Sequence, residues 1–95
     1  MLVTEAIEGL ALVSNGCYVD ATYGRGGHSA EILNKLGRKG RLLALDKDPE
    51  ATEHAMHRFA DDLRFTVCHA DFASLRDHVQ PWLKGDRLVG VLLDL

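Results

Sequence analysis

The sequence predicts an α/β fold in which one parallel, doubly wound sheet is covered by helices. Short apolar runs with strand-like composition alternate with segments in which apolar residues recur every three or four positions. A single helix between successive strands requires parallel pairing and right-handed crossovers. With 95 residues the chain can form at most one compact domain, so a complete two-domain enzyme is excluded.

The first part of the chain predicts a helix, a strand and a second helix. Apolar residues at helical spacing within residues 3–10 predict an amphipathic helix that ends at Asn15-Gly16. Residues 17–21 are expected to form a short strand. A glycine-rich stretch follows, and the apolar spacing of residues 29–36 predicts the next helix, which Gly37 closes.

The second part predicts three more strands and two more helices. Residues 41–45 are mostly apolar, as expected for a strand that is buried on both faces. Asp48-Pro49 combines an N-cap residue with a proline suited to the first helical position, so a helix is expected to begin there. The remaining elements are a strand at residues 65–68, a helix over residues 75–83 that Pro81 is expected to bend or restart, and a strand at residues 88–93.

Composition and charge exclude several classes of protein. The 46% hydrophobic and 26% charged residues are typical of a globular chain, and the net charge of -3 is not that of a dedicated nucleic-acid binder. No apolar stretch approaches the roughly 20 residues that span a bilayer, and the start lacks the basic region of a signal peptide, so we expect a cytoplasmic protein without a membrane segment.

Cysteine and histidine spacing does not indicate a metal site. Cys17 and Cys68 lack CxxC spacing, which favours two reduced thiols over a disulfide or a metal site. His54 and His57 lie three positions apart on a predicted helix, but no third ligand has recognisable spacing. We therefore interpret both histidines as surface residues and predict no metal.

Polar residues follow every predicted strand, at the edge of the sheet where ligands bind in open parallel sheets. Glycines at positions 24, 26 and 27 allow the backbone to approach a ligand closely, and the next helix offers free N–H groups. Asp46, about 20 residues later at the end of the next strand, is placed to accept hydrogen bonds from both hydroxyls of an adenosine ribose. Together these features predict a nucleoside-containing cofactor.

The residues around the glycines favour S-adenosylmethionine over NAD. Ser29 occupies the position of the third glycine in the dinucleotide fingerprint. Asp20, just before the glycines, would repel a pyrophosphate but suits the ammonium group of a methionine moiety. Phe72 after the third strand could contact an adenine or only pack the next helix. Asp94 after the fourth strand is either a simple strand-ending acid or the best candidate near the transferred methyl.

Two further residues near the glycines keep alternative roles. His28 stands at the predicted helix start, where it could contact the cofactor or only support the loop. Arg25 could bind a phosphate of a substrate or face solvent.

Residues 19–29, Val-Asp-Ala-Thr-Tyr-Gly-Arg-Gly-Gly-His-Ser, closely resemble the signature of the bacterial small-subunit ribosomal RNA cytosine-N4 methyltransferases, also called the MraW or RsmH family. The stretches 45–51, 69–72 and 90–95 resemble the same family in the same order. The resemblance implies a Rossmann-like class I methyltransferase fold, of which this chain holds the first four strands. It also implies methyl transfer to N4 of a cytidine in 16S ribosomal RNA.

Carried over to this sequence, the resemblance implies cofactor contacts by Gly26, Gly27, His28, Asp46, Phe72 and Asp94. Asp20 joins this set only through the charge argument, and no catalytic base can be assigned beyond the position of Asp94. Family members continue past Asp94-Leu95 and carry an additional helical insertion. We therefore interpret residues 1–95 as the N-terminal part of the cofactor-binding domain of a larger enzyme, which acts on 16S ribosomal RNA within the small ribosomal subunit.

Two other classes of function are weighed against this interpretation. One is the NAD-binding domain of an oxidoreductase, which Ser29 and Asp20 oppose. The other is a noncatalytic α/β binding module, which only the short length supports. The exposed fourth strand predicts that residues 1–95 on their own are marginally stable and tend to associate.

Overall fold

The computed structural model describes residues 14–92, apart from the side chain of Phe72. The helix predicted within residues 3–10 and the residue Asp94 lie outside the described residues. In chain order the elements are β1 (Cys17–Asp20), α2 (Gly27–Lys35), β2 (Arg41–Asp46), α3 (Pro49–Arg58), β3 (Phe65–His69), the short 3-10 helix η1 (Phe72–Ser74), α4 (Leu75–Leu83) and β4 (Leu88–Leu92).

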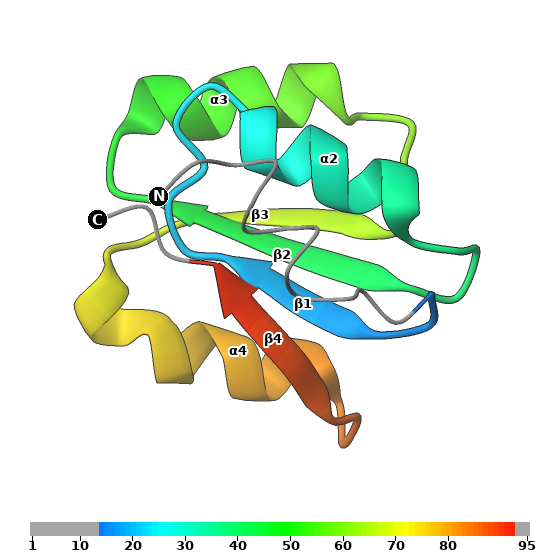
Figure 1. Ribbon diagram of the computed structural model, residues 1–95. Helices are drawn as coiled ribbons and strands as arrows, with labels where there is room; N and C mark the ends of the chain where they lie inside the picture. Colours follow the sequence, from blue (N-terminus) through cyan, green and yellow to red (C-terminus); the bar gives the residue numbers. More distant parts are fainter. Residues whose placement is uncertain (1–13, 93–95) are drawn as a thin grey trace.

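The strands form one fully parallel sheet in the order β3-β2-β1-β4 (Figure 1). From β1 the chain proceeds outward to β2 and then to β3, which lies at one edge of this sheet. Strand β4 then pairs with the opposite side of β1. The order of the strands therefore reverses between β1 and β4, which is the switch point of a doubly wound sheet. The predicted α/β fold with a parallel sheet is confirmed.

Helices cover both faces of the sheet, with α2 and α3 side by side on one face and α4 on the other (Figure 1). Alternate residues of the central strands supply the two apolar layers. Tyr18 and Leu42 pack with residues of α2, whereas Val19 and Leu43 pack on the side of α4. Both faces of β1 and β2 are buried, which the sequence predicted for β2 from its nearly continuous apolar run.

The observed boundaries differ from the predicted ones at two helices. Helix α2 begins at Gly27, two residues before the predicted start, because Gly26 adopts a left-handed conformation with φ of 90° and serves as the N-cap. Helix α4 runs through Pro81 as one helix, so a restart there is excluded, whereas the bend stays a prediction. The carbonyl that Pro81 leaves without a helical donor belongs to Asp77, whose exposure allows water to replace the missing bond.

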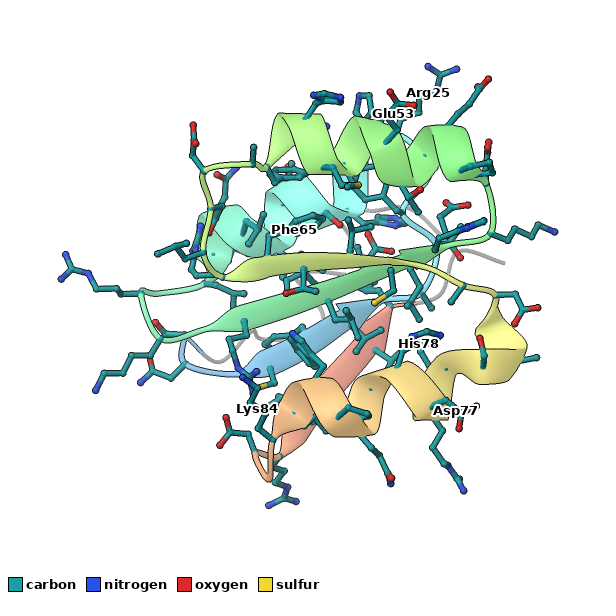
Figure 2. All side chains as sticks on the ribbon, turned by 180° about the vertical axis from the view of Figure 1, so that it is seen from behind. Arg25, Glu53, Phe65, Asp77, His78 and Lys84 are labelled. Carbon is teal, nitrogen blue, oxygen red and sulfur yellow. The ribbon has the colours of Figure 1, made fainter. Side chains whose placement is uncertain are left out.

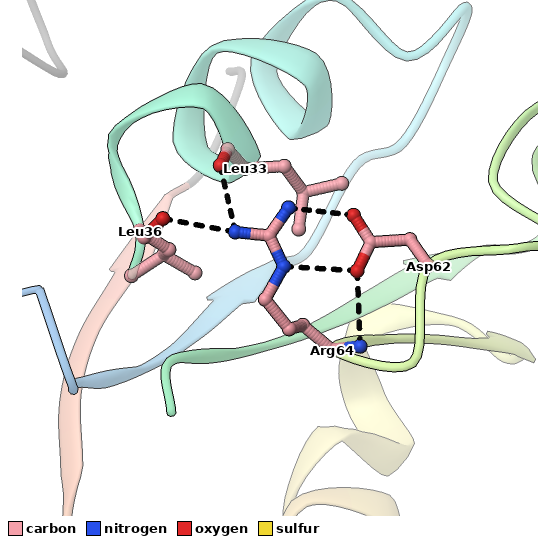
Figure 3. Close-up of polar contacts among 4 residues, drawn as sticks. All are labelled: Leu33, Leu36, Asp62 and Arg64. Atoms are coloured by element: carbon pink, nitrogen blue, oxygen red, sulfur yellow. Dashed lines mark hydrogen bonds and ion pairs between the residues drawn. The ribbon is translucent and has the colours of Figure 1, made fainter. Parts of the chain in front are cut away.

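Arg64 joins the end of α2 to the connection between α3 and β3 (Figure 3). Its Nη1 donates to the carbonyl oxygens of Leu33 and Leu36 at 3.0 and 2.9 Å, and its Nη2 lies 2.6 Å from Oδ2 of Asp62. These carbonyls belong to the last turn of α2, where no helical N–H remains to bind them. The guanidinium group therefore fixes α2 against the sheet at the end remote from the glycine-rich turn.

Candidate cofactor site at the strand ends

The carboxylate of Asp20 lies at the end of β1 and is completely buried. Its Oδ1 accepts a hydrogen bond from the backbone N–H of Thr22 at 3.1 Å, and its Oδ2 accepts one from the hydroxyl of Ser29 at 2.8 Å. Burial raises the pKa of Asp20 to about 6, although both hydrogen bonds act in the opposite direction. Asp20 thus connects the end of β1 to the first turn of α2, across the glycine-rich turn.

The predicted contact of Asp20 with a ligand ammonium group stays a prediction. What the structure adds is the bond to Ser29, which is also completely buried. The position that holds glycine in a dinucleotide site is here occupied by a hydroxyl that binds an acid. Asp20 and Ser29, the two residues that argue against NAD, are therefore joined by a hydrogen bond.

The glycine-rich turn requires glycine at Gly26. Its φ of 90° is strained for other residues, and an added Cβ would stand 2.6 Å from the Tyr23 hydroxyl oxygen and 2.8 Å from Nη1 of Arg58. At Gly27 an added Cβ would meet nothing within 4 Å, so the space above the start of α2 is open. The structure leaves room for a ligand at the backbone of Gly27, and the predicted cofactor contact there stays a prediction.

Asp46 at the end of β2 is held in place by two backbone donors. Its Oδ2 accepts from the N–H of Gly24 at 2.8 Å, and its Oδ1 accepts from the N–H of Asp48 at 2.9 Å. The carboxylate is only partly buried, and each oxygen keeps a second lone pair. The acid and the turn, far apart in sequence, are thus joined by a direct bond, and the carboxylate is oriented before any ligand arrives.

A cavity of about 450 Å³ opens beside Asp46, between the ends of β1, β2 and β3. It is lined by Ala21, Thr22, Asp46, Lys47, Ala70, Asp71 and Ala73. Residue 72, at the start of η1, lies in the chain between two of the lining residues. The predicted roles of Phe72 and Asp94 stay predictions, because the side chain of the first and the whole of the second lie outside the described part.

His28 provides a test of whether the site suits a polar ligand. It is the second residue of α2 and only 5% exposed, and within residues 14–92 its Nε2 is buried with no hydrogen-bond partner. A buried polar atom without a partner is costly, and a ligand that hydrogen-bonds to it would remove that cost. Together with the oriented Asp46 carboxylate, this unsatisfied nitrogen fits a polar cofactor such as S-adenosylmethionine.

The sequence did not predict that Tyr23, His54 and Arg58 lie together beside the turn. Tyr23, 2% exposed, packs its ring under α3, and a hydrogen bond of 2.9 Å joins its hydroxyl to Nδ1 of His54. Burial raises the pKa of Tyr23, while the charge of Arg58 and a hydrogen bond to it lower that pKa. His54 is exposed as predicted but is not free. The only signal was the spacing of four between His54 and Arg58, which places both on one helix face.

The side chains of the other predicted residues do not line the cavity beside Asp46. Arg25 points away from the sheet near the outer side of α3, as does Glu53 (Figure 2). Cys17 and Cys68 are both free thiols, the first buried and the second only partly buried. Among the described residues no group of three or more His, Cys, Asp or Glu side chains could hold a metal ion. No helix within the same range is long and apolar enough to cross a membrane.

Solved structures resemble this fold at low sequence identity. An rRNA methylase from Streptococcus thermophilus superposes with a TM-score of 0.66 at 24% identity, over 80% of this chain and 46% of that protein. A mycolic acid cyclopropane synthase complexed with SAH gives a TM-score of 0.64 at 16% identity, over 75% of this chain and 25% of that one. These likenesses confirm the predicted Rossmann-like methyltransferase fold.

Similarity in sequence is much closer and covers the whole chain. A protein of Alteromonas mediterranea named ribosomal RNA small subunit methyltransferase H is 50% identical over 95 residues, which are 100% of this chain and 30% of that protein. A protein of the same name from Shewanella oneidensis is 47% identical over the same shares. The chain thus spans about 30% of the length of these curated relatives. The model of the MraW methylase family matches residues 1–95, and the chain belongs to that family.

Proposed function

We propose that this chain carries the first half of the S-adenosylmethionine site of an enzyme that methylates N4 of a cytidine in 16S ribosomal RNA. The observation that carries the proposal is the bond between the Gly24 N–H and Asp46. It joins the glycine-rich turn after β1 to an acid at the end of the neighbouring strand β2, in a chain that belongs to the MraW methylase family. The names of the curated relatives support ribosomal RNA of the small subunit as the substrate.

Several of the described residues bind or position the cofactor, each in a different way. Asp46 accepts hydrogen bonds from the ribose hydroxyls through its free lone pairs, and His28 hydrogen-bonds through its unpartnered Nε2. The open space at Gly27 lets the ligand approach the backbone, Gly26 gives the turn its left-handed bend beside it, and Asp20 keeps the turn in shape through Ser29. S-adenosylmethionine, when bound, supplies an electrophilic methyl group. Phe72 and Asp94 complete the pocket, with Asp94 nearest the chemistry by its place after β4.

The substrate imposes demands that these residues meet only in part. The lone pair of a cytosine amino group is delocalised into the ring, so the acceptor nitrogen must be held in line and must lose a proton. The base must also be unstacked or already single-stranded to reach a pocket. The net charge of -3 favours an RNA-holding surface outside residues 1–95 or on the ribosomal particle. Work on the small ribosomal subunit implies a cytoplasmic enzyme.

The structure and the family disfavour the two other functions that the sequence left open. The buried Asp20–Ser29 bond stands where a dinucleotide site needs glycine and no negative charge. A noncatalytic module does not require a carboxylate that is oriented by two backbone donors beside an open cavity.

The direct test is methylation of small ribosomal subunits by the complete protein, with tritiated S-adenosylmethionine and nucleoside analysis by mass spectrometry. We expect N4-methylated cytidine from the wild type and at least a tenfold lower rate at limiting cofactor for Asp46→Ala. Asp61→Ala, which removes an exposed acid after α3, is the matched control and should keep the wild-type rate. Label on another nucleotide, or none on 16S RNA, would contradict the proposal.

A further inference from the structure

Helix α3 is attached to the glycine-rich turn by two polar contacts. The Tyr23 hydroxyl, at the start of the turn, is hydrogen-bonded to Nδ1 of His54 at 2.9 Å. Nη1 of Arg58, one helical turn later, donates to the carbonyl oxygen of Arg25 at 3.0 Å. The two contacts thus bind α3 to both halves of the turn, one through a side chain and the other through the backbone.

The two contacts meet at Gly26. The Tyr23 hydroxyl and Arg58 Nη1 both lie within 3 Å of the place that a Cβ at Gly26 would occupy. The left-handed Gly26 residue is therefore flanked by both groups. Since Gly26 is also the N-cap of α2, the two contacts lie directly beside the start of α2, where Gly27 and His28 follow.

His54 and Arg58 lie on the exposed part of α3 and do not belong to the buried apolar core. His54 and Arg58 are exposed, whereas the apolar residues of α3 that face the sheet are Ala51 and Ala55. His54 also lines a cavity of about 270 Å³ with Gly24 and Arg25 of the turn. Ala51 and Ala55 therefore make the apolar contacts of α3 with the sheet. His54 and Arg58 lie against the rings of Tyr23 and Phe59, and their hydrogen bonds are directed at the turn beside a cavity.

We propose that His54 and Arg58 are positioning residues, which hold the glycine-rich turn in its ligand-binding shape through Tyr23 and Arg25. This inference rests on the proposed function, because the turn is the part of the chain proposed to bind S-adenosylmethionine. A turn held rigid before binding loses less conformational entropy when the ligand arrives, so these contacts raise cofactor affinity without touching the cofactor. They act on binding and leave the methyl-transfer step itself to other groups.

The test is calorimetric titration of the complete protein with S-adenosylhomocysteine, for the wild type, Tyr23→Phe, His54→Ala and the double variant. Tyr23→Phe keeps the buried ring and removes only the hydroxyl. We expect each single change to raise the Kd about three- to tenfold, the range of one net hydrogen bond, and the double variant to match the single ones. His57→Ala, an exposed histidine on the same helix, should stay within about twofold of the wild type.

Steady-state kinetics and melting curves complete the test. The KM for S-adenosylmethionine should rise in parallel with the Kd, while kcat changes less than twofold and the Tm stays within about 2 °C. Unchanged Kd values in Tyr23→Phe and His54→Ala would overturn the inference while leaving the proposed function intact. Fully additive losses, or a lower Tm with unchanged Kd, would also overturn it. Failure of the wild type to bind would overturn the proposed function and this inference together.

Discussion

Burial of the Asp20 carboxylate raises its pKa from 3.8 to about 6, because the surrounding residues exclude the water that would stabilise its charge. The hydrogen bonds from Ser29 and Thr22 act against this shift but do not cancel it. The folded chain therefore binds a proton at Asp20 more tightly than the unfolded chain does. Between the two pKa values, folding takes up protons and is favoured by acid.

This shift predicts how Asp20→Asn changes the pH dependence of stability. The favourable contribution of Asp20 is complete below about pH 4 and is lost as the pH rises through about 6. The amide is uncharged; its oxygen can still accept from the N–H of Thr22, and its NH2 group can donate to the Ser29 hydroxyl oxygen. The stability of this variant relative to the wild type should therefore grow between pH 4 and 7 by an amount on the order of 3 kcal/mol. Urea unfolding of the complete protein at several pH values measures this difference.

The control is Asp61→Asn, which changes an exposed acid and should follow the wild-type pH profile. Parallel profiles for Asp20→Asn and the wild type would show that the Asp20 pKa is not raised in the folded state.

At the scale of secondary-structure elements, the end of α2 depends on a residue outside the helix. Arg64 donates to the Leu33 and Leu36 carbonyls, and hydrogen bonding to Arg64 lowers the pKa of Asp62. We expect Arg64→Met to lower the free energy of unfolding by about 1 to 3 kcal/mol, because two partly buried carbonyls lose their donor. Denaturant midpoints of the complete protein provide the measurement.

Arg38→Met is the matched control, because Arg38 is exposed in the connection after α2. Its midpoint should equal that of the wild type within error. Equal midpoints for Arg64→Met and Arg38→Met would mean that the end of α2 does not need the guanidinium group.

The sequence predicted the elements themselves better than the contacts between them. Asp48-Pro49 starts α3 as expected, since the Asp48 side chain accepts from the N–H of Glu50 at 2.9 Å. The early start of α2 was missed, because the left-handed Gly26 N-cap has no side-chain signature. The Tyr23 to His54 contact was also missed, because it depends on how α3 lies against the glycine-rich turn and not on any local pattern.

At the scale of the whole molecule, the topology brings several of the predicted site residues together, and their roles stay predictions. Asp20, the glycines and Asp46 lie close together because the carboxyl ends of parallel strands point to the same side of the sheet. Their proximity therefore follows from the order of the elements. The sequence could not show that Asp20 is completely buried or that the Nε2 of His28 has no partner within the described range. Both depend on side-chain packing around the start of α2.

The same topology leaves β3 and β4 at the two edges of the sheet, with Val89 of β4 47% exposed. A polypeptide of residues 1–95 made on its own is therefore expected to be marginally stable and to associate through strand edges. Far-UV circular dichroism at several protein concentrations should show a melt that shifts with concentration. A cooperative melt at one temperature for all concentrations would contradict this expectation.

The central claim is that the turn and Asp46 form a site for a methyl donor. Calorimetric titration of the complete protein with S-adenosylhomocysteine and, separately, with NAD tests it most directly, with folded Asp46→Ala in parallel. We predict that S-adenosylhomocysteine binds, that NAD does not, and that Asp46→Ala weakens binding at least tenfold, since an acceptor for the ribose hydroxyls is lost. Binding of NAD alone, or of neither ligand, by the folded wild type would contradict the claim.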